Sequence, residues 1–168
     1  IKSLYPESYD HDVPDDLTYC GSKKWTDKIE NYDIGKMLLS PTRSYAPLLK
    51  KIFEKVGRDK INGIIHCTGG GQTKILHFVD DLHIMKNNLF ETPPIFKLIM
   101  NESNTDPKEM YKVFNMGHRM EIYIHPDYAS DIIEISKSVG IDAKIIGEVL
   151  KSQKKKLSIQ SELGNFEY

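Results

Sequence analysis

The feature that most restricts this chain is a glycine triplet, Gly69–Gly71, which follows a short run rich in isoleucine at residues 61–67 after the single residue Thr68. Such a run is typical of a buried strand, and the apolar spacing that follows predicts a short helix over residues 72–79. The loop between them is therefore expected to turn sharply. Because residues without side chains let backbone N–H groups come close to an anion at a helix start, a phosphate or a carboxylate would suit this loop.

The triplet also has a simpler explanation, a tight strand-to-helix turn that binds nothing, because isolated glycine motifs occur often without a ligand. It is not the phosphate-binding loop of P-loop proteins. That motif ends in Gly-Lys-Ser/Thr, whereas Lys74 here follows Thr73 and lies a turn into the predicted helix. ATP binding by that route is unsupported.

Beyond this unit, helical and strand patterns alternate along the chain. Helices are expected from Ser40 and Pro41 to Val56, from Pro93, from Asp106 and from Pro126 to Val139; strands are expected at residues 82–85, 120–124, 143–150 and 157–160. The last two strands are predicted to form a hairpin through a turn at 153–156. This order predicts an α+β fold, a layered α/β/α domain with a mixed sheet, partly similar to a split βαβ (ferredoxin-like) arrangement.

Residues 1–33 are rich in Asp, Pro, Tyr and Ser, and we expect an extended lead-in segment with little regular structure. Residues 34–168 are expected to form one domain, because a chain of 168 residues usually builds a single core. The first residues include neither an initiator methionine nor a signal peptide. The chain is therefore expected to be a piece of something longer.

Charge and cysteine content restrict the expected partners. A net charge of -1 and a pI near 6.7 give no attraction to nucleic acid or anionic lipid, and no run reaches the roughly 18 apolar residues of a membrane helix. We therefore expect a small-molecule substrate, no nucleic acid and no membrane. Cys20 and Cys67 lie in no disulfide pattern, which favours reduced thiols and a cytoplasmic location.

Two other segments carry candidate binding residues. In the loop that precedes residues 120–124, Asn115 is a candidate donor to a substrate carbonyl and Arg119 a candidate partner for a phosphate. Left-handed turn geometry at Asn115 and Gly117 explains this loop equally well. Near the first predicted helix, Thr42 and Arg43 are candidates for holding an anion, whereas helix capping explains the residues before them.

No metal or nucleophile pattern stands out. The sequence has no HExxH, no CxxC and no clustered carboxylates, so no metal site is expected. Neither cysteine has an activating pattern beyond the adjacent pair His66-Cys67. No catalytic residue is therefore identified.

Four motifs, taken together, resemble a known family. Leu38-Leu-Ser-Pro-Thr-Arg-Ser-Tyr45 is similar to Leu-Leu-x-Pro-Thr-Arg-x-Tyr, Ile65-His-Cys-Thr-Gly-Gly-Gly71 to Ala-His-x-Thr-Gly-Gly-Gly, Pro93-Pro-Ile-Phe96 to Pro-Pro-x-Phe, and Glu109-Met-Tyr-Lys-Val-Phe-Asn-Met-Gly117 to Glu-Met-Tyr-x-x-Phe-Asn-x-Gly. The family is phosphoribosylformylglycinamidine cyclo-ligase, also called aminoimidazole ribonucleotide synthetase. The motifs follow the family's order and approximate spacing, and the chain resembles the C-terminal domain only.

The resemblance implies a ligase of purine biosynthesis that closes formylglycinamidine ribonucleotide to aminoimidazole ribonucleotide at the expense of ATP. In this family ATP and Mg²⁺ would be bound mainly by an N-terminal domain that precedes the matched region. That domain is absent here, so the chain alone is expected to be inactive. The family also implies a homodimer of the full-length enzyme, with the enzyme's own N-terminal domain as a partner.

By the same resemblance, the residues expected to bind substrate or its phosphate are Thr42, Arg43, His66, Thr68, Gly69, Gly70, Gly71 and Asn115. The residues of the glycine loop would present backbone donors, with the others nearby. This chain departs from the family at two places. Gln72-Thr73-Lys74-Ile75 stands where the family often has Leu-x-Glu-Asn, and His118-Arg119 follows Gly117 where it has x-Gly. Substrate contacts at these positions are not transferred, and a related substrate stays open.

Two alternatives remain open from the sequence. The first alternative to the cyclo-ligase is a non-catalytic module that binds a metabolite or supports an assembly. The second is part of another enzyme of the same architecture. Such enzymes include selenophosphate synthetase, thiamine monophosphate kinase and a hydrogenase maturation factor. The four motifs count against the second alternative.

Overall fold

The computed structural model of the chain describes residues 22–41 and 43–168. The strands are β1 (Lys28–Ile29), β2 (Tyr32–Asp33), β3 (Ile61–His66), β4 (Leu82–Lys86), β5 (Met120–Ile124), β6 (Gly147–Lys151), β7 (Lys156–Ser161) and β8 (Gly164–Glu167). The helices are α1 (Ile34–Leu38), α2 (Ala46–Lys55), α3 (Pro94–Ser103), α4 (Pro107–Val113) and α5 (Ala129–Ser138), with 3₁₀ helices η3 (Arg58–Lys60), η4 (Gly71–His77) and η5 (Pro126–Tyr128). In this part of the chain no helix is long and apolar enough to cross a membrane.

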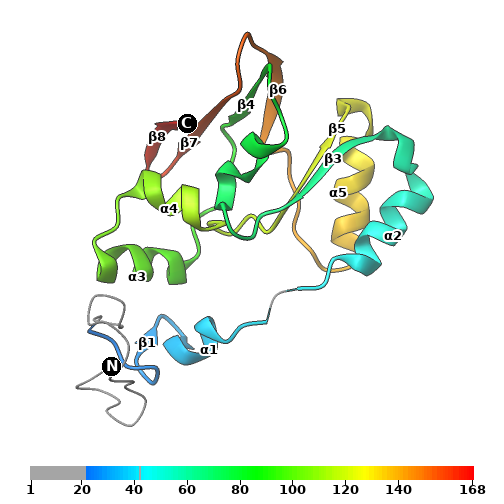
Figure 1. Cartoon of the computed structure of the whole chain (residues 1–168). Coiled ribbons are helices and arrows are strands. Elements are labelled where there is room, and N and C mark those ends of the chain that lie inside the picture. Colours follow the sequence, from blue (N-terminus) through cyan, green and yellow to red (C-terminus); the bar gives the residue numbers. More distant parts are fainter. Residues whose placement is uncertain (1–21, 42) are drawn as a thin grey trace, which may run out of the picture.

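The antiparallel pair of β3 and β5 lies between helices α2 and α5 on one side and the other strands of the domain on the other (Figure 1). Ile64 lies opposite Ile122 and Ile61 opposite Ile124, which gives the pair one isoleucine-rich face. Helices α2 and α5 cover that face, and the buried residues of this cluster are Leu48, Ile52, Ile132 and Ile135. The alternation at residues 120–124 therefore predicted a strand with two unlike faces correctly.

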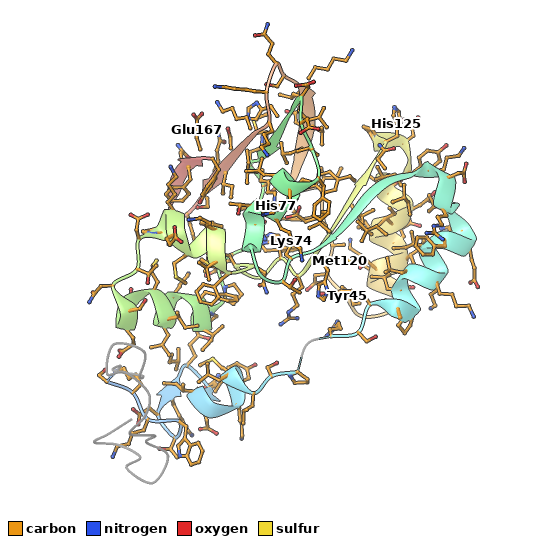
Figure 2. All side chains as sticks on the ribbon, in the orientation of Figure 1. Tyr45, Lys74, His77, Met120, His125 and Glu167 are labelled. Atoms are coloured by element: carbon orange, nitrogen blue, oxygen red, sulfur yellow. The ribbon has the colours of Figure 1, made fainter. Side chains whose placement is uncertain are left out.

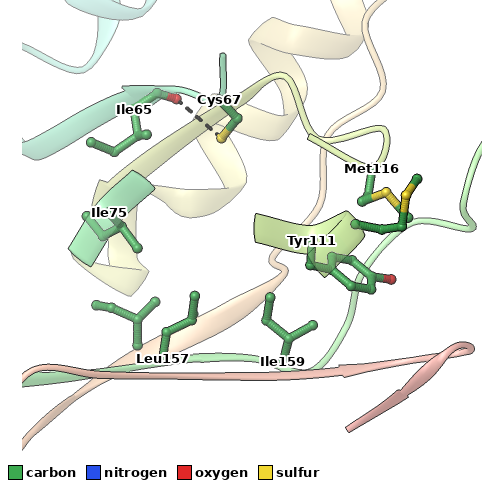
Figure 3. Packing of buried hydrophobic residues seen from close by; sticks show 9 residues of the cluster. Ile65, Cys67, Ile75, Tyr111, Met116, Leu157 and Ile159 are labelled. Carbon is green, nitrogen blue, oxygen red and sulfur yellow. Dashed lines mark hydrogen bonds between the residues drawn. The ribbon is translucent and has the colours of Figure 1, made fainter. Parts of the chain in front are cut away.

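The opposite face of the β3–β5 pair meets a second core. Figure 3 shows Ile65 and Cys67 on one side of this core and Leu157 and Ile159 of β7 on the other, with Tyr111 of α4 between them. Both faces of β3 and β5 are therefore covered, although only two strands form the pair.

The second core rests on a four-stranded mixed sheet in the order β6-β4-β7-β8. Strands β4 and β7 are parallel, and the other two pairings are antiparallel. This confirms the expected α+β fold with a mixed sheet.

The predicted hairpin of residues 143–150 with 157–160 is wrong, because β4 lies between β6 and β7. Turn residues at 153–156 and short sequence separation favoured a hairpin. However, Ile84 and Lys86 of β4 are both buried, and a strand of this kind belongs at the centre of a sheet with a neighbour on each side. The hairpin in this region is instead formed by β7 and β8.

Helix boundaries differ from expectation at three places. One is the helix expected from Pro126 to Val139, where Pro126–Tyr128 form the 3₁₀ helix η5 and α5 begins at Ala129. Helix α2 begins at Ala46 and not at Ser40, because Pro47 fits only the first turn of a helix. Gly57, with φ 95°, follows the end of α2 as predicted. Residues 71–77 form the 3₁₀ helix η4 where a short α-helix was expected. Within the described part of the lead-in, β1 and β2 form a small antiparallel pair.

A substitution at Gly147 of β6 tests whether β6 packs against β4. A Cβ at Gly147 would collide with the carbonyl oxygen of Met85 and come within 2.9 Å of the Lys86 Cα. We expect Gly147→Ala to lower the free energy of unfolding by about 1 to 3 kcal/mol, as measured by urea denaturation. The control is Gly63→Ala in β3, where the nearest atoms, of Tyr123, lie 4.0 Å away. Equal effects of the two substitutions would contradict the β4–β6 packing.

Candidate functional site

The glycine loop is a tight turn at the end of β3. The Thr68 amide donates to the His66 carbonyl oxygen at 2.8 Å, and the Gly71 amide donates to the Thr68 carbonyl oxygen at 3.0 Å. Gly70 has φ 89°, in the left-handed region that glycine adopts without strain. The turn therefore depends on backbone contacts within residues 66–71.

The three glycines have different surroundings. A Cβ at Gly71 would collide with the carbonyl oxygen of Phe114 and lie 2.7 Å from that of Tyr111, so this glycine lets the loop pack against the end of α4. Its amide is already bonded to Thr68, so the expectation that Gly71 presents a donor to a ligand is wrong. Gly69 has no atom within 4 Å of a Cβ position, and in residues 22–41 and 43–168 no acceptor bonds the Gly69 or Gly70 amide.

The second candidate loop, residues 114–119, is also a structured turn. The Asn115 side-chain oxygen accepts from the Gly117 amide at 2.9 Å. Met116 and Gly117 have φ values of 50° and 96°, so the left-handed residues are these two and not Asn115. The Asn115 oxygen is therefore committed to the turn, and its amide nitrogen is the group left for a ligand.

Gln72 joins the two loops. Its side chain is buried, and Nε2 donates to the carbonyl oxygens of Asn115 at 2.8 Å and His118 at 3.3 Å. Gln72 and Asn115 are 43 residues apart in sequence, yet this one amide group joins the two loops. Sequence analysis selected both loops and missed the residue that connects them.

Lys86 at the end of β4 completes this connection. Its ammonium donates to the Gln72 backbone oxygen at 2.8 Å, to Gln72 Oε1 at 3.1 Å and to Glu121 Oε1 at 2.5 Å. Tyr123 Oη donates to the other Glu121 oxygen at 2.6 Å. We call Gln72, Lys86, Glu121 and Tyr123 the buried polar cluster. It connects β4, η4 and β5.

A sequence signal for the buried polar cluster existed but was weak. Lys86 lies on the same face of β4 as buried Ile84, and Glu121 lies on the same face of β5 as Tyr123, because residues two apart in a strand point to the same side. Alternation alone predicts a strand with two unlike faces and does not show what covers the Glu121 face. Only the packing of the four-stranded sheet over that face shows that it is covered.

Cys67 lies beside this cluster and behaves as a core residue. Burial is the main reason that the pKa of its thiol rises to about 12, and the Glu121 carboxylate acts in the same direction. The thiol is therefore protonated at neutral pH, which does not suit a nucleophile.

His118 is a buried histidine, and one of its two ring nitrogens has no hydrogen-bond partner among the described residues. Nε2 accepts from the Phe90 amide at 2.9 Å, whereas Nδ1 has no hydrogen-bond partner among the described residues. Burial is the main reason that the His118 pKa falls to about 4; Lys86 and Lys144 lower it further, and Glu121 and the Met116 carbonyl oppose the change. The ring is neutral at physiological pH.

The remaining predicted residues lie at different places. His66 ends β3, with its ring edge-on to Tyr45 at 6.3 Å between centroids, and Thr68 follows it. Lys74 Nζ donates to the His66 carbonyl oxygen at 3.1 Å and to Thr68 Oγ1 at 2.7 Å. Figure 2 shows Lys74 between the four-stranded sheet and the β3–β5 unit.

Arg43 does not join this group in the structure. The Arg43 guanidinium donates to the Gly140 carbonyl oxygen at 3.0 Å, beyond the end of α5, and no described contact joins it to the glycine loop. Thr42 lies outside the described residues.

Comparison with protein families identifies a match to "AIR synthase related protein, C-terminal domain" over residues 18–160. Among curated proteins, phosphoribosylformylglycinamidine cyclo-ligase of Methanococcus vannielii is 38% identical over 112 residues, which are 67% of this chain and 31% of that protein. The enzyme of the same name from Syntrophus aciditrophicus is 34% identical over 140 residues, 78% of this chain and 38% of that protein. The chain thus spans about a third of the length of these relatives.

A solved structure, HypE of E. coli, a hydrogenase maturation protein, matches with a TM-score of 0.53 and 18% identity. The match covers 74% of this chain and 38% of that one. Identity this low supports the shared architecture only.

The buried polar cluster gives a first prediction for this region. Lys86→Met leaves the Glu121 carboxylate buried without its cation, and we expect the free energy of unfolding to fall by about 3 to 5 kcal/mol. Adding Glu121→Gln removes the unpaired charge and keeps an acceptor for Tyr123, so the double variant is expected to recover part of the loss. Urea denaturation of the wild type, the two single variants and the double variant measures the coupling free energy between Lys86 and Glu121. The same double-mutant cycle on the exposed pair Lys50–Glu54 is the control. Additive single effects would contradict the pairing.

His118 gives a prediction about pH. Its pKa is about 4 in the folded chain and ordinarily about 6.5, so the unfolded state binds a proton more readily. The histidine's contribution to stability is complete above pH 6.5 and is lost as the pH falls toward 4. Between pH 7.5 and 5 we expect a loss of roughly 2 kcal/mol that His118→Gln removes. Urea denaturation at both pH values measures this, with exposed His125→Gln as the control. An unchanged pH dependence in His118→Gln would assign the loss to other groups.

Proposed function

Because the chain belongs to the family "AIR synthase related protein, C-terminal domain", we propose that it is the substrate-binding portion of a cyclo-ligase. The reaction is the ATP-dependent conversion of formylglycinamidine ribonucleotide to aminoimidazole ribonucleotide. Relatives that carry the name phosphoribosylformylglycinamidine cyclo-ligase support this proposal. Since the chain spans about a third of their length, the activity belongs to a larger protein or assembly.

The observation that carries the proposal is the contact between two motif-bearing loops. Residues 68–71 and 114–117 hold the Thr-Gly-Gly-Gly and Phe-Asn-x-Gly motifs, and Gln72 bonds the second loop from the start of η4. Functional groups that a reaction needs at one place must come from segments brought together by the fold. Two motifs far apart in sequence are adjacent here, which favours a common ligand.

The chemistry makes modest demands on this chain. ATP supplies a phosphoryl group that activates the formyl oxygen as a leaving group, and an amidine nitrogen then attacks the formyl carbon to close the ring with release of phosphate. This chain would orient the ribonucleotide. The free amides of Gly69 and Gly70, the Thr68 hydroxyl and the Asn115 amide nitrogen are the donors that we assign to this task.

The described residues do not fit a site for ATP and its metal ion. No group of three His, Cys, Asp or Glu side chains within residues 22–41 and 43–168 is arranged to hold a metal. The glycine loop also lacks the Gly-Lys-Ser/Thr ending of a P-loop. We therefore assign ATP and Mg²⁺ to an N-terminal domain that works with this chain, and we expect the complete enzyme to be a homodimer.

Gly69 offers a direct test of ligand binding, because a Cβ there would have no protein atom within 4 Å. Gly69→Val is expected to weaken binding of formylglycinamidine ribonucleotide at least about tenfold by blocking access to the loop amides. Thermal unfolding should stay unchanged, and isothermal titration calorimetry measures the affinity. Asn62→Val, an exposed substitution in β3, is the control. Unchanged affinity in Gly69→Val would remove the glycine loop from the site.

Catalysis is tested on this chain combined with the ATP-binding domain. ADP release that depends on formylglycinamidine ribonucleotide is the expected result. No ADP release, with the ribonucleotide still bound, would instead favour a non-catalytic metabolite-binding role.

A further inference from the structure

Lys74 is a lysine whose ammonium is held over the glycine loop. Nζ donates to Thr68 Oγ1 at 2.7 Å and to the His66 carbonyl oxygen at 3.1 Å. An ammonium group has three donors, so these two bonds leave one N–H free. The stem also touches the loop, because a Cβ at Gly70 would lie 3.6 Å from the Lys74 Cβ.

The charge of Lys74 has no anionic partner in the described part of the chain. Both of its acceptors are neutral oxygens, and no carboxylate there forms an ion pair with Nζ. The nearby buried acid, Glu121, is already paired with Lys86. The described residues therefore do not neutralise the positive charge at the loop, which favours an anion.

The residue at this position departs from the family motif that the chain resembles. Lys74 stands where the family motif often carries a glutamate, so the charge beside the loop is reversed. Lys74 is half-buried, and its ammonium is fixed by two bonds before any ligand arrives. Fixing a long side chain in advance lowers the entropy that binding costs.

We propose that Lys74 binds the phosphate of the ribonucleotide substrate and makes the glycine loop selective for the phosphorylated ligand. This inference rests on the proposed function and deepens it. In this arrangement the free N–H of the ammonium donates to a phosphate oxygen, and Thr68 and His66 hold the lysine in place.

The test compares two ligands that differ only in the phosphate, formylglycinamidine ribonucleotide and its 5′-dephosphorylated ribonucleoside. Calorimetry on the wild-type chain is expected to show tighter binding of the ribonucleotide. Lys74→Met should weaken ribonucleotide binding by about tenfold to a hundredfold and leave ribonucleoside binding within about twofold. Lys74→Gln, which keeps a hydrogen-bond donor without the charge, should lose the same preference, whereas Lys74→Arg should retain part of it.

Lys155→Met is the matched control. In the wild type, Lys155 Nζ donates to the Leu76 carbonyl oxygen at 3.3 Å. The substitution therefore removes one lysine that bonds the same helix as Lys74, η4. We expect wild-type affinities for both ligands. Because phosphate binding by a cation weakens with salt, the ribonucleotide affinity should fall with ionic strength more steeply in the wild type than in Lys74→Gln.

The outcomes separate this inference from the proposed function. If the wild type binds both ligands equally, or if Lys74→Met and Lys74→Gln keep the preference for the phosphate, the role of Lys74 is refuted and the substrate assignment stands. An equal loss of both ligands in Lys74→Gln would show that Lys74 only shapes the loop. If the wild type binds neither ligand, both the inference and the assignment of substrate binding to this chain are refuted.

Discussion

The ion pair of Lys86 with Glu121 is the interaction on which the site depends. A lysine and a glutamate, 1% and 5% exposed, sit between the four-stranded sheet and the β3–β5 pair. Removing two charges from water is costly, and the cost is offset only if the remaining hydrogen-bonding groups are also satisfied. Gln72 and Tyr123 provide those bonds. The same contacts hold η4, and with it the glycine loop, at a defined distance from β5.

The residues of the glycine loop have two kinds of role, shaping the turn and offering groups to a proposed ligand. Gly71 is needed because the loop touches the end of α4, and Gly70 because the backbone there is left-handed. In the described part of the chain the Gly69 and Gly70 amides bond no acceptor, and these two amides and the Lys74 ammonium are the groups that we propose for a ligand. A tight turn and a binding loop are therefore compatible explanations here, because the left-handed backbone at Gly70 makes the turn while the Gly70 amide bonds no described acceptor.

The two departures from the family motif belong to one structural unit. Gln72 follows the glycines and His118 follows Gly117, and the Gln72 amide donates to the His118 backbone oxygen. The His118 ring in turn accepts from the Phe90 amide. Gln72 and His118, two changed positions that are far apart in the sequence, are therefore in contact between the two loops. They alter how the loops are held together. Two further changed positions carry a positive charge: Lys74, whose ammonium bonds Thr68 and the His66 carbonyl oxygen, and Arg119, which is exposed.

Sequence by itself determined the local elements and the family. Apolar spacing located β3, β4 and β5, and the motif residues identified the two loops, because periodicity and turn preferences are local properties. Tertiary structure decided the rest. The position of β4 between β6 and β7, the burial of Glu121 and the bond from Gln72 to residues 43 and 46 positions away depend on which surfaces pack together. A pattern read along one strand cannot show what covers its far face, because the covering sheet comes from other parts of the chain.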